Sequence, residues 1–454
     1  MAARVRHRRG GIMTSAARVL VTTPAADTPS VATPAPAGGL APVRSNVRLA
    51  GEHFAAAMLY LIAGAIGLVW IAPELAIGAY PSPRVAGITH LFTLGWLSTT
   101  IFGALYQLLP VALGSPIRSI RVGHAAFWTF APGAGIFAAG VASSSIMLHH
   151  TGITLLTIGI ILAAGNIGSS MARARSRDVT WAAIALALTF LASTLVLGIV
   201  LLHNMHTGFL AEARIRVLAI HLHVALVGWA LIMMVGVSHR LLPMFLLSHG
   251  ADTRWTKRAL ALLASGVIVL ATGLSARMPS AAWVGVLLLE GGVGCFLWQA
   301  ISFYRKRVRK KTDVGMRFAG TALSFLTVSA LLGPAVLARG VGHPRLATAY
   351  IAVGLLGGIA MYITGFFYKI VPLLAWTVRF RDRMGKGTAP TIAQMFSARV
   401  AHLQLGCMAL GVTLLASGIG AGSVHATRCG AVLFLGGVLL FVSQIARVTM
   451  GGTS

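Results

Sequence analysis

The sequence predicts an all-α, polytopic membrane protein of roughly twelve transmembrane helices in three pseudo-repeated groups of four. Of its 454 residues, 57% are hydrophobic and only 10% are charged, which excludes a soluble domain. Hydrophobic runs of bilayer length recur along the chain, and we number them as spans 1 to 12. The expected spans are 54–72, 85–112, 122–142, 147–168, 181–203, 215–247, 258–276, 281–303, 318–338, 346–376, 400–420 and 425–447.

One helix-length pattern occurs three times, in spans 2, 6 and 10. Each copy ends in a proline, with a glycine seven residues earlier and an aromatic residue or histidine four residues earlier. The prolines and glycines are Pro110, Pro243, Pro372, Gly103, Gly236 and Gly365. A histidine stands twenty residues before the proline in the first two copies, as His90 and His223. Twenty helical residues cover roughly 30 Å, so histidine and proline are expected at opposite membrane faces.

The repeat predicts that spans 2, 6 and 10 surround a pseudo-threefold axis. Small residues allow two helix backbones to approach closely. We therefore expect Gly103, Gly236 and Gly365 at helix contacts, with the three repeat prolines at matching depths.

The net charge of +28 is distributed mainly over alternate loops. By the positive-inside rule these loops, and with them both termini, are cytoplasmic. This topology accounts for the basic residues without nucleic-acid binding. The basic loops contain Arg118 and Arg121, then Arg173, Arg175 and Arg177, then Arg254, Lys257 and Arg258, then residues 305–311, and finally residues 379–386.

The chain divides into a tail and a membrane domain. Residues 1–50 are rich in Arg, Ala, Pro and Thr and lack an apolar run, which predicts a disordered basic cytoplasmic tail. Residues 51–450 hold the twelve expected spans, whose direct partner is the lipid bilayer.

Histidines at the outer ends of spans 2 and 6 are candidate ligands, because an ionisable group inside a membrane is costly to retain. A neutral imidazole that bonds to a neighbouring helix is the alternative for each. Recurrence at one repeat position favours ligation for His90 and His223. His221 points about 200° away from His223 on a helix, so these two are expected to serve different sites.

Two further groups have candidate roles. His203 and His206 can share one helix face and, with Met205 beside them, could form a copper site; a hydrated polar loop is the alternative. His221 is a further candidate metal ligand. Glu290 is the carboxylate well inside a predicted span, where it could relay protons or bond as a neutral carboxyl to a neighbouring helix.

The twelve spans, the three groups of four and the histidines of spans 2 and 6 resemble the catalytic subunit of heme-copper oxidases and nitric oxide reductases. The likeness runs from about residue 50 to the end and extends to NnrS-type membrane proteins. It implies a bacterial cytoplasmic membrane. By this resemblance His90 matches a ligand of the low-spin heme, and His221 or His223 occupies the region of a copper ligand.

The chain departs from the oxidase pattern on span 10, which reads Tyr350-Ile-Ala352 where oxidases have His-x-His. The histidine pair expected between spans 7 and 8 is absent as well. The resemblance therefore implies one heme, of b type, between His90 and His223, with copper as a further cofactor.

The function expected from the resemblance is redox or diatomic-gas chemistry at heme, and any enzyme activity would be that of an oxidoreductase. No residue is assigned to catalysis. The sequence has no heme-attachment motif, so electrons would come from a quinol or a separate donor protein. The alternative is a transporter, or a protein that handles heme or metal, on the same scaffold without turnover.

Overall fold

A computed structural model describes residues 40–451, apart from residues 251, 309 and 381–388. The chain has two contact units, residues 1–41 and 42–454, and the second contains the spans. The helices of the described residues are α1 (Leu40–Trp70), α2 (Ala72–Ala76), α3 (Pro83–His90), α4 (Thr99–Ala112), α5 (Ile120–Ser143), α6 (Ile146–Met171), α7 (Val179–Thr207), α8 (Arg214–His223), α9 (Ile232–Leu246), α10 (Thr253–Ser275), α11 (Pro279–Arg305), α12 (Val314–Arg339), α13 (Pro344–Ala352), α14 (Met361–Phe380), α15 (Ala398–Ala421) and α16 (Val424–Met450).

Within the described residues, 12 helices are long and apolar enough to cross a membrane, which confirms the predicted class of all-α, multi-pass membrane protein. Three of these spans are built from consecutive helices that join without a break. Span 2 is Pro83–Ala112, span 6 is Ala211–Leu246 and span 10 is Pro344–Phe380. The first span begins earlier than predicted, because α1 starts at Leu40.

The predicted tail of residues 1–50 therefore overlaps the first helix, and its residues 1–39 lie outside the described part of the chain. Near the N-terminal end of α1, Arg48 and Glu52 form an ion pair one helical turn apart, at 3.1 Å. Leu49 is fully buried against α5, where it contacts Gly123. Composition alone did not show that this polar stretch packs.

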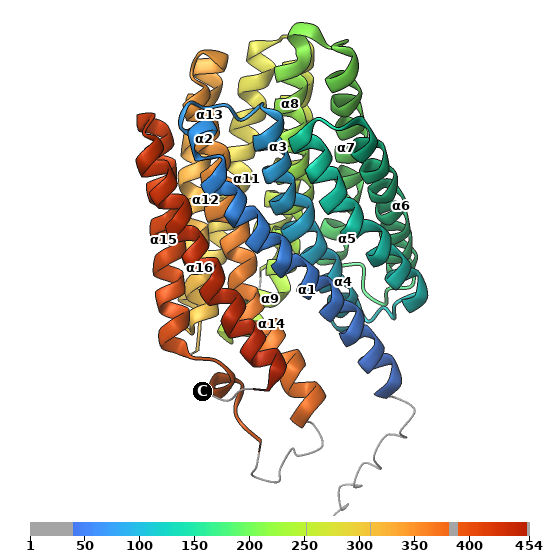
Figure 1. Cartoon of the computed structure of the whole chain (residues 1–454). Coiled ribbons are helices and arrows are strands. Elements are labelled where there is room, and N and C mark those ends of the chain that lie inside the picture. The colour runs from blue at the N-terminus through green and yellow to red at the C-terminus, as the bar shows by residue number, and fades with distance from the viewer. Residues whose placement is uncertain (1–39, 251, 309, 381–388, 452–454) are drawn as a thin grey trace, which may run out of the picture. The chain divides into compact units, whose positions relative to one another are not determined.

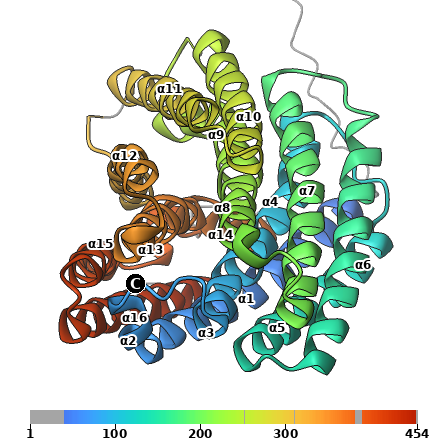
Figure 2. The ribbon, with the colours of Figure 1, turned by 90° about the horizontal axis from the view of Figure 1, so that it is seen from above.

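Spans 3 and 4, 7 and 8, and 11 and 12 form three tight helical hairpins: α5–α6, α10–α11 and α15–α16 (Figure 1). Glycines bring the two backbones of each hairpin together. A Cβ on Gly152, Gly285 or Gly430 would collide with the backbone of the facing helix. Figure 2 shows these pairs around the outside of the bundle, with α4, α8 and α14 nearer its middle.

Spans 2, 6 and 10 share a local feature that the sequence did not predict. Each contains an eight-residue π-helical segment, Leu91–Ser98, Val224–Leu231 or Val353–Ala360. Each segment begins immediately after the repeat position of His90, His223 or Ala352. π-helical turns in α-helices frequently lie at functional sites. The repeat position that precedes each segment lies toward one end of the bundle. We call it the histidine end, and the end with Pro110, Pro243 and Pro372 the proline end.

The repeat glycines lie at close helix contacts, as predicted. A Cβ on Gly103, Gly236 or Gly365 would overlap an atom of the preceding odd-numbered span, and for Gly365 that atom is the Gly315 carbonyl oxygen at 2.5 Å. The three central helices are thus held against spans 1, 5 and 9 by the same contact.

Ion pairs recur at the proline end in the second and third repeats. Asp178 caps α7 and bonds to Arg240, and Asp313 caps α12 and accepts a hydrogen bond from Lys369 Nζ at 2.6 Å. Burial disfavours ionisation of Asp178, but hydrogen bonds from the Trp181 backbone and from Arg240 outweigh it and lower its pKa. Both basic residues stand three before the repeat proline.

The charge pattern predicts which end is cytoplasmic, and this can be measured in intact cells. We expect a cysteine at Thr207→Cys, at the histidine end, to react with a membrane-impermeant maleimide. A cysteine at Lys310→Cys should react only after permeabilisation, because its loop carries the cationic cluster that the positive-inside rule retains. The background lacks the three native cysteines. The reverse labelling pattern would contradict the predicted orientation.

Candidate functional site

His90 and His223 are held in the same way by their own helices. His90 Nδ1 lies 2.7 Å from the Ala86 carbonyl, and His223 Nδ1 lies 2.8 Å from the Ala219 carbonyl. A ring nitrogen that donates to a carbonyl carries the proton, which leaves Nε2 as the nitrogen with a free lone pair. Metal-ligating histidines are commonly oriented in this way. His402 makes the same bond at 2.6 Å, so the bond alone does not define a site.

His90 lies together with His221. Both residues line two cavities of about 100 and 90 Å³ at the histidine end, between spans 2 and 6. His221 Nδ1 is buried and makes no hydrogen bond of normal geometry, although the Thr194 backbone lies near the ring. The ring of His90 rests edge-on against Phe137, with 5.2 Å between ring centroids. The imidazoles of His90 and His221 thus line the same two cavities.

His223 lies in a different cavity, of about 240 Å³, which it lines with Tyr350 and Glu290. Its Nε2 is 3.3 Å from the Tyr350 hydroxyl. Gly333 keeps space for the carboxyl, since a Cβ there would lie 3.2 Å from Glu290 Oε1. Glu290 has no ion-pair partner among the described residues.

The repeat explains why His90 and His223 line different cavities. His90 and His223 occupy the same repeat position on two different helices, and His221 and Tyr350 both stand twenty-two residues before their repeat proline. The pair His90–His221 between spans 2 and 6 therefore corresponds to the pair His223–Tyr350 between spans 6 and 10. The third pair, between spans 10 and 2, would be Ala352 and Ile88, whose apolar side chains cannot bind a metal.

The sequence expected His90 and His223 at one iron, whereas in the structure they line separate cavities. His221 and His223 line different cavities.

His206 contacts His149 and His150 and not His203. Its Nε2 lies 3.1 Å from His149 Nδ1, and its ring stacks on His150 with 6.1 Å between centroids. His203 instead packs on Phe209, at 5.3 Å. No group of three or more His, Cys, Asp or Glu side chains in the described part of the chain is arranged to hold a metal ion. The sequence places the adjacent pair His149 and His150 at the same membrane face, at the start of span 4, but does not predict that they contact His206.

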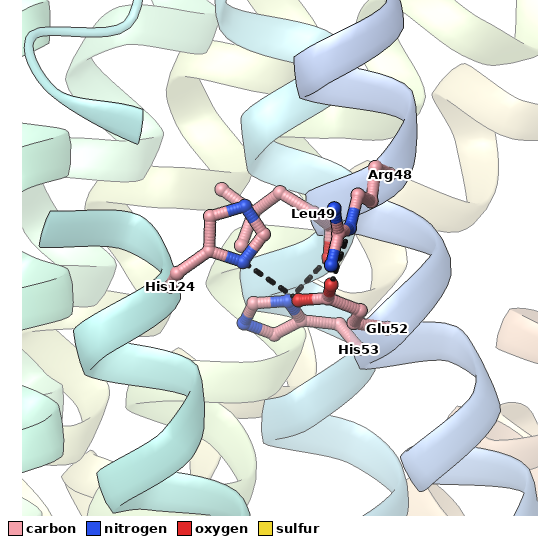
Figure 3. A network of polar contacts seen from close by, with 5 residues as sticks. All are labelled: Arg48, Leu49, Glu52, His53 and His124. Carbon is pink, nitrogen blue, oxygen red and sulfur yellow. Dashed lines mark hydrogen bonds and ion pairs between the residues drawn. The ribbon is translucent and has the colours of Figure 1, made fainter. Parts of the chain in front are cut away.

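A second polar network lies at the proline end, between spans 1 and 3 (Figure 3). Glu52 bonds to Arg48 at 3.1 Å and to His124 Nδ1 at 2.7 Å. His53 Nδ1 lies 2.8 Å from the Leu49 carbonyl. Because these bonds occupy the carboxylate and pair both basic partners, the network fits a structural role that fixes α1 against α5.

Comparisons with known proteins give likenesses in structure but none in sequence. No family model and no curated protein matches the chain. A heme-copper terminal oxidase, solved as a dimer by cryo-electron microscopy, is similar at 9% sequence identity and a TM-score of 0.46, over 90% of this chain and 85% of the oxidase chain.

Proposed function

We propose that this protein holds a redox-active metal centre at the histidine end, with His90 and His221 as ligands. The observation that supports this most is that His90 and His221 line the same two cavities, with His221 Nδ1 buried and without a hydrogen bond of normal geometry. A buried polar atom without a partner is costly, and a metal ion would satisfy it. We also propose that the protein is a distant member of the heme-copper oxidase superfamily and is related to the NnrS-type membrane proteins.

The imidazoles of His90 and His221 are suitable ligands for both heme and copper, but heme needs more space than the cavities provide. Imidazoles are axial ligands of b-type heme and good ligands of copper. Pockets that hold organic cofactors measure roughly 300–1,000 Å³. The two cavities beside His90 and His221 measure about 100 and 90 Å³. A porphyrin therefore requires the lining side chains to move apart, whereas a single copper ion needs far less space.

The protein's part in such a site is to position the ligands and exclude water. The Ala86 carbonyl fixes the orientation of His90, and Phe137 packs against its ring. The remaining lining is mostly apolar, including Leu218 and Leu222. When bound, the metal would supply electron transfer or binding of a diatomic gas. We propose the bacterial cytoplasmic membrane as its location, with cytoplasmic termini and a quinol or separate protein as electron donor.

A visible spectrum and a metal analysis of the purified protein test this function. The protein is expressed with added heme precursor and copper. Sharp bands in the reduced state identify a heme held by two histidines, and copper without those bands identifies a copper centre; either outcome supports the proposal. A colourless protein without either metal contradicts it.

In that case a transporter becomes the better function. The specific observation that favours it is the cavity of about 240 Å³ in which Glu290, Tyr350 and His223 lie inside the bundle. Ionisable residues at membrane depth commonly line transport pathways.

A further inference from the structure

The cavity of about 240 Å³ at the histidine end contains one acid and one base, Glu290 and Arg216. Neither forms an ion pair in the described part of the chain, with the other or with any further residue. An ionisable group inside a membrane is costly to retain and commonly lies at a binding or transport site. This cavity is separate from the two that His90 and His221 line.

Hydrogen-bond acceptors lie together around Glu290. A Cβ on Gly333 would be 3.2 Å from Glu290 Oε1 and 3.9 Å from Tyr350 Cε2, so the carboxyl and the phenol ring lie beside the same glycine. His223 Nδ1 donates to the Ala219 carbonyl, and its Nε2 lies 3.3 Å from the Tyr350 hydroxyl. The hydroxyl therefore donates to the imidazole, and its oxygen accepts from a ligand. Acceptors beside a carboxylate suit an ammonium group, which carries only donors.

Arg216 lies nearer to the end of the bundle. It stands seven residues before His223 in α8, roughly 10 Å along the helix. Its guanidinium is a planar fork that matches a carboxylate. Arg216 is half-buried, and Gly340 lines the same cavity while exposed in the connection between spans 9 and 10. A dissolved molecule can therefore reach the cavity from this end.

The walls between the two charges are mostly apolar, with leucines from spans 7, 8 and 9 that include Leu263, Leu289 and Leu326. A complementary ligand therefore carries a cation and an anion joined by an apolar chain. An amine alone would leave Arg216 unpaired, and an acid alone would leave Glu290 unpaired. Pockets for drug-sized ligands measure roughly 300–1,000 Å³, so this cavity suits a smaller molecule.

We propose that this cavity binds a small zwitterion whose ammonium and carboxylate are separated by an aliphatic chain, as in an ω-amino acid. The ammonium pairs with Glu290 and donates to the Tyr350 oxygen, and the carboxylate pairs with Arg216. The chain contacts the leucine walls. Binding here does not require the metal centre proposed above.

Binding is measured by equilibrium dialysis of radiolabelled 6-aminohexanoate against the whole protein in phospholipid nanodiscs, with empty nanodiscs subtracted. We expect saturable binding by the wild type. Glu290→Gln and Arg216→Gln should each weaken it about tenfold or more, because each removes one ion pair with the ligand. The matched control is Glu212→Gln, an exposed acid near the same end that does not line this cavity, and it should bind as the wild type does.

Two analogues test the charges from the side of the ligand. 6-Hydroxyhexanoate lacks the ammonium, 6-aminohexan-1-ol lacks the carboxylate, and each should compete about tenfold more weakly than 6-aminohexanoate. No saturable binding, equal binding by the wild type and both variants, or equal competition by either analogue would overturn the proposal. The analogue results do not depend on whether a variant folds. His90→Ala should lose the metal and keep this binding, so the two proposals can fail separately.

Discussion

Replacing His90 or His221 by alanine is expected to remove the metal centre from the purified protein. Each change deletes one of the two imidazoles that line the same cavities, and replacing even an outer-shell partner of a metal ligand typically costs about 10–100-fold in affinity. Loss of a direct ligand should cost more. The measurement is metal content per protein, with the visible spectrum if heme is bound.

Two matched variants make this prediction specific. His402→Ala removes an exposed histidine whose ring makes the same bond to its own helix, and it should keep the metal. His223→Ala removes the histidine at the repeat position of His90 and should also keep it, because His223 lines another cavity. Loss of metal from His223→Ala but not from His221→Ala would contradict the assignment.

Gly365→Ala is expected to destabilise the fold by about 2 kcal/mol, a usual cost of overpacking a core. The added Cβ would lie 2.5 Å from the Gly315 carbonyl oxygen. That atom is backbone, so span 9 as a whole has to move away from span 10. Thermal unfolding in detergent or nanodiscs measures the loss.

The control for this substitution is Gly406→Ala on span 11, where nothing lies within 4 Å of an added Cβ. It should unfold with the wild type or slightly above it, because alanine favours helix over glycine. If Gly365→Ala were as stable as Gly406→Ala, the close contact at the repeat glycine would not hold the central helices.

The overall fold could be predicted from the sequence because its signals are periodic and strong. Hydrophobic length fixed the spans, and the spacing of Gly236 and Pro243 placed equivalent residues on equivalent helices. The π-helical segments could not be predicted, because they depend on bonds between residues five apart that leave no compositional mark. The start of α1 was missed because Leu49 is held by tertiary packing.

The candidate site was predictable in its members but not in its pairing. His90, His221 and His223 were all identified from sequence. Identical repeat positions suggested that His90 and His223 act together. Around a threefold axis, however, equivalent residues lie at successive helix junctions, so the histidine that lines the same cavities as His90 stands at another repeat position, His221.

A cryo-electron microscopy map of the metal-loaded protein tests the central claim most directly. We predict density for the metal at the histidine end between spans 2 and 6, with His90 Nε2 and His221 Nδ1 each about 2 Å from it. Metal bound by His223, or a loaded protein in which both His90 and His221 lie away from the density, would contradict this account.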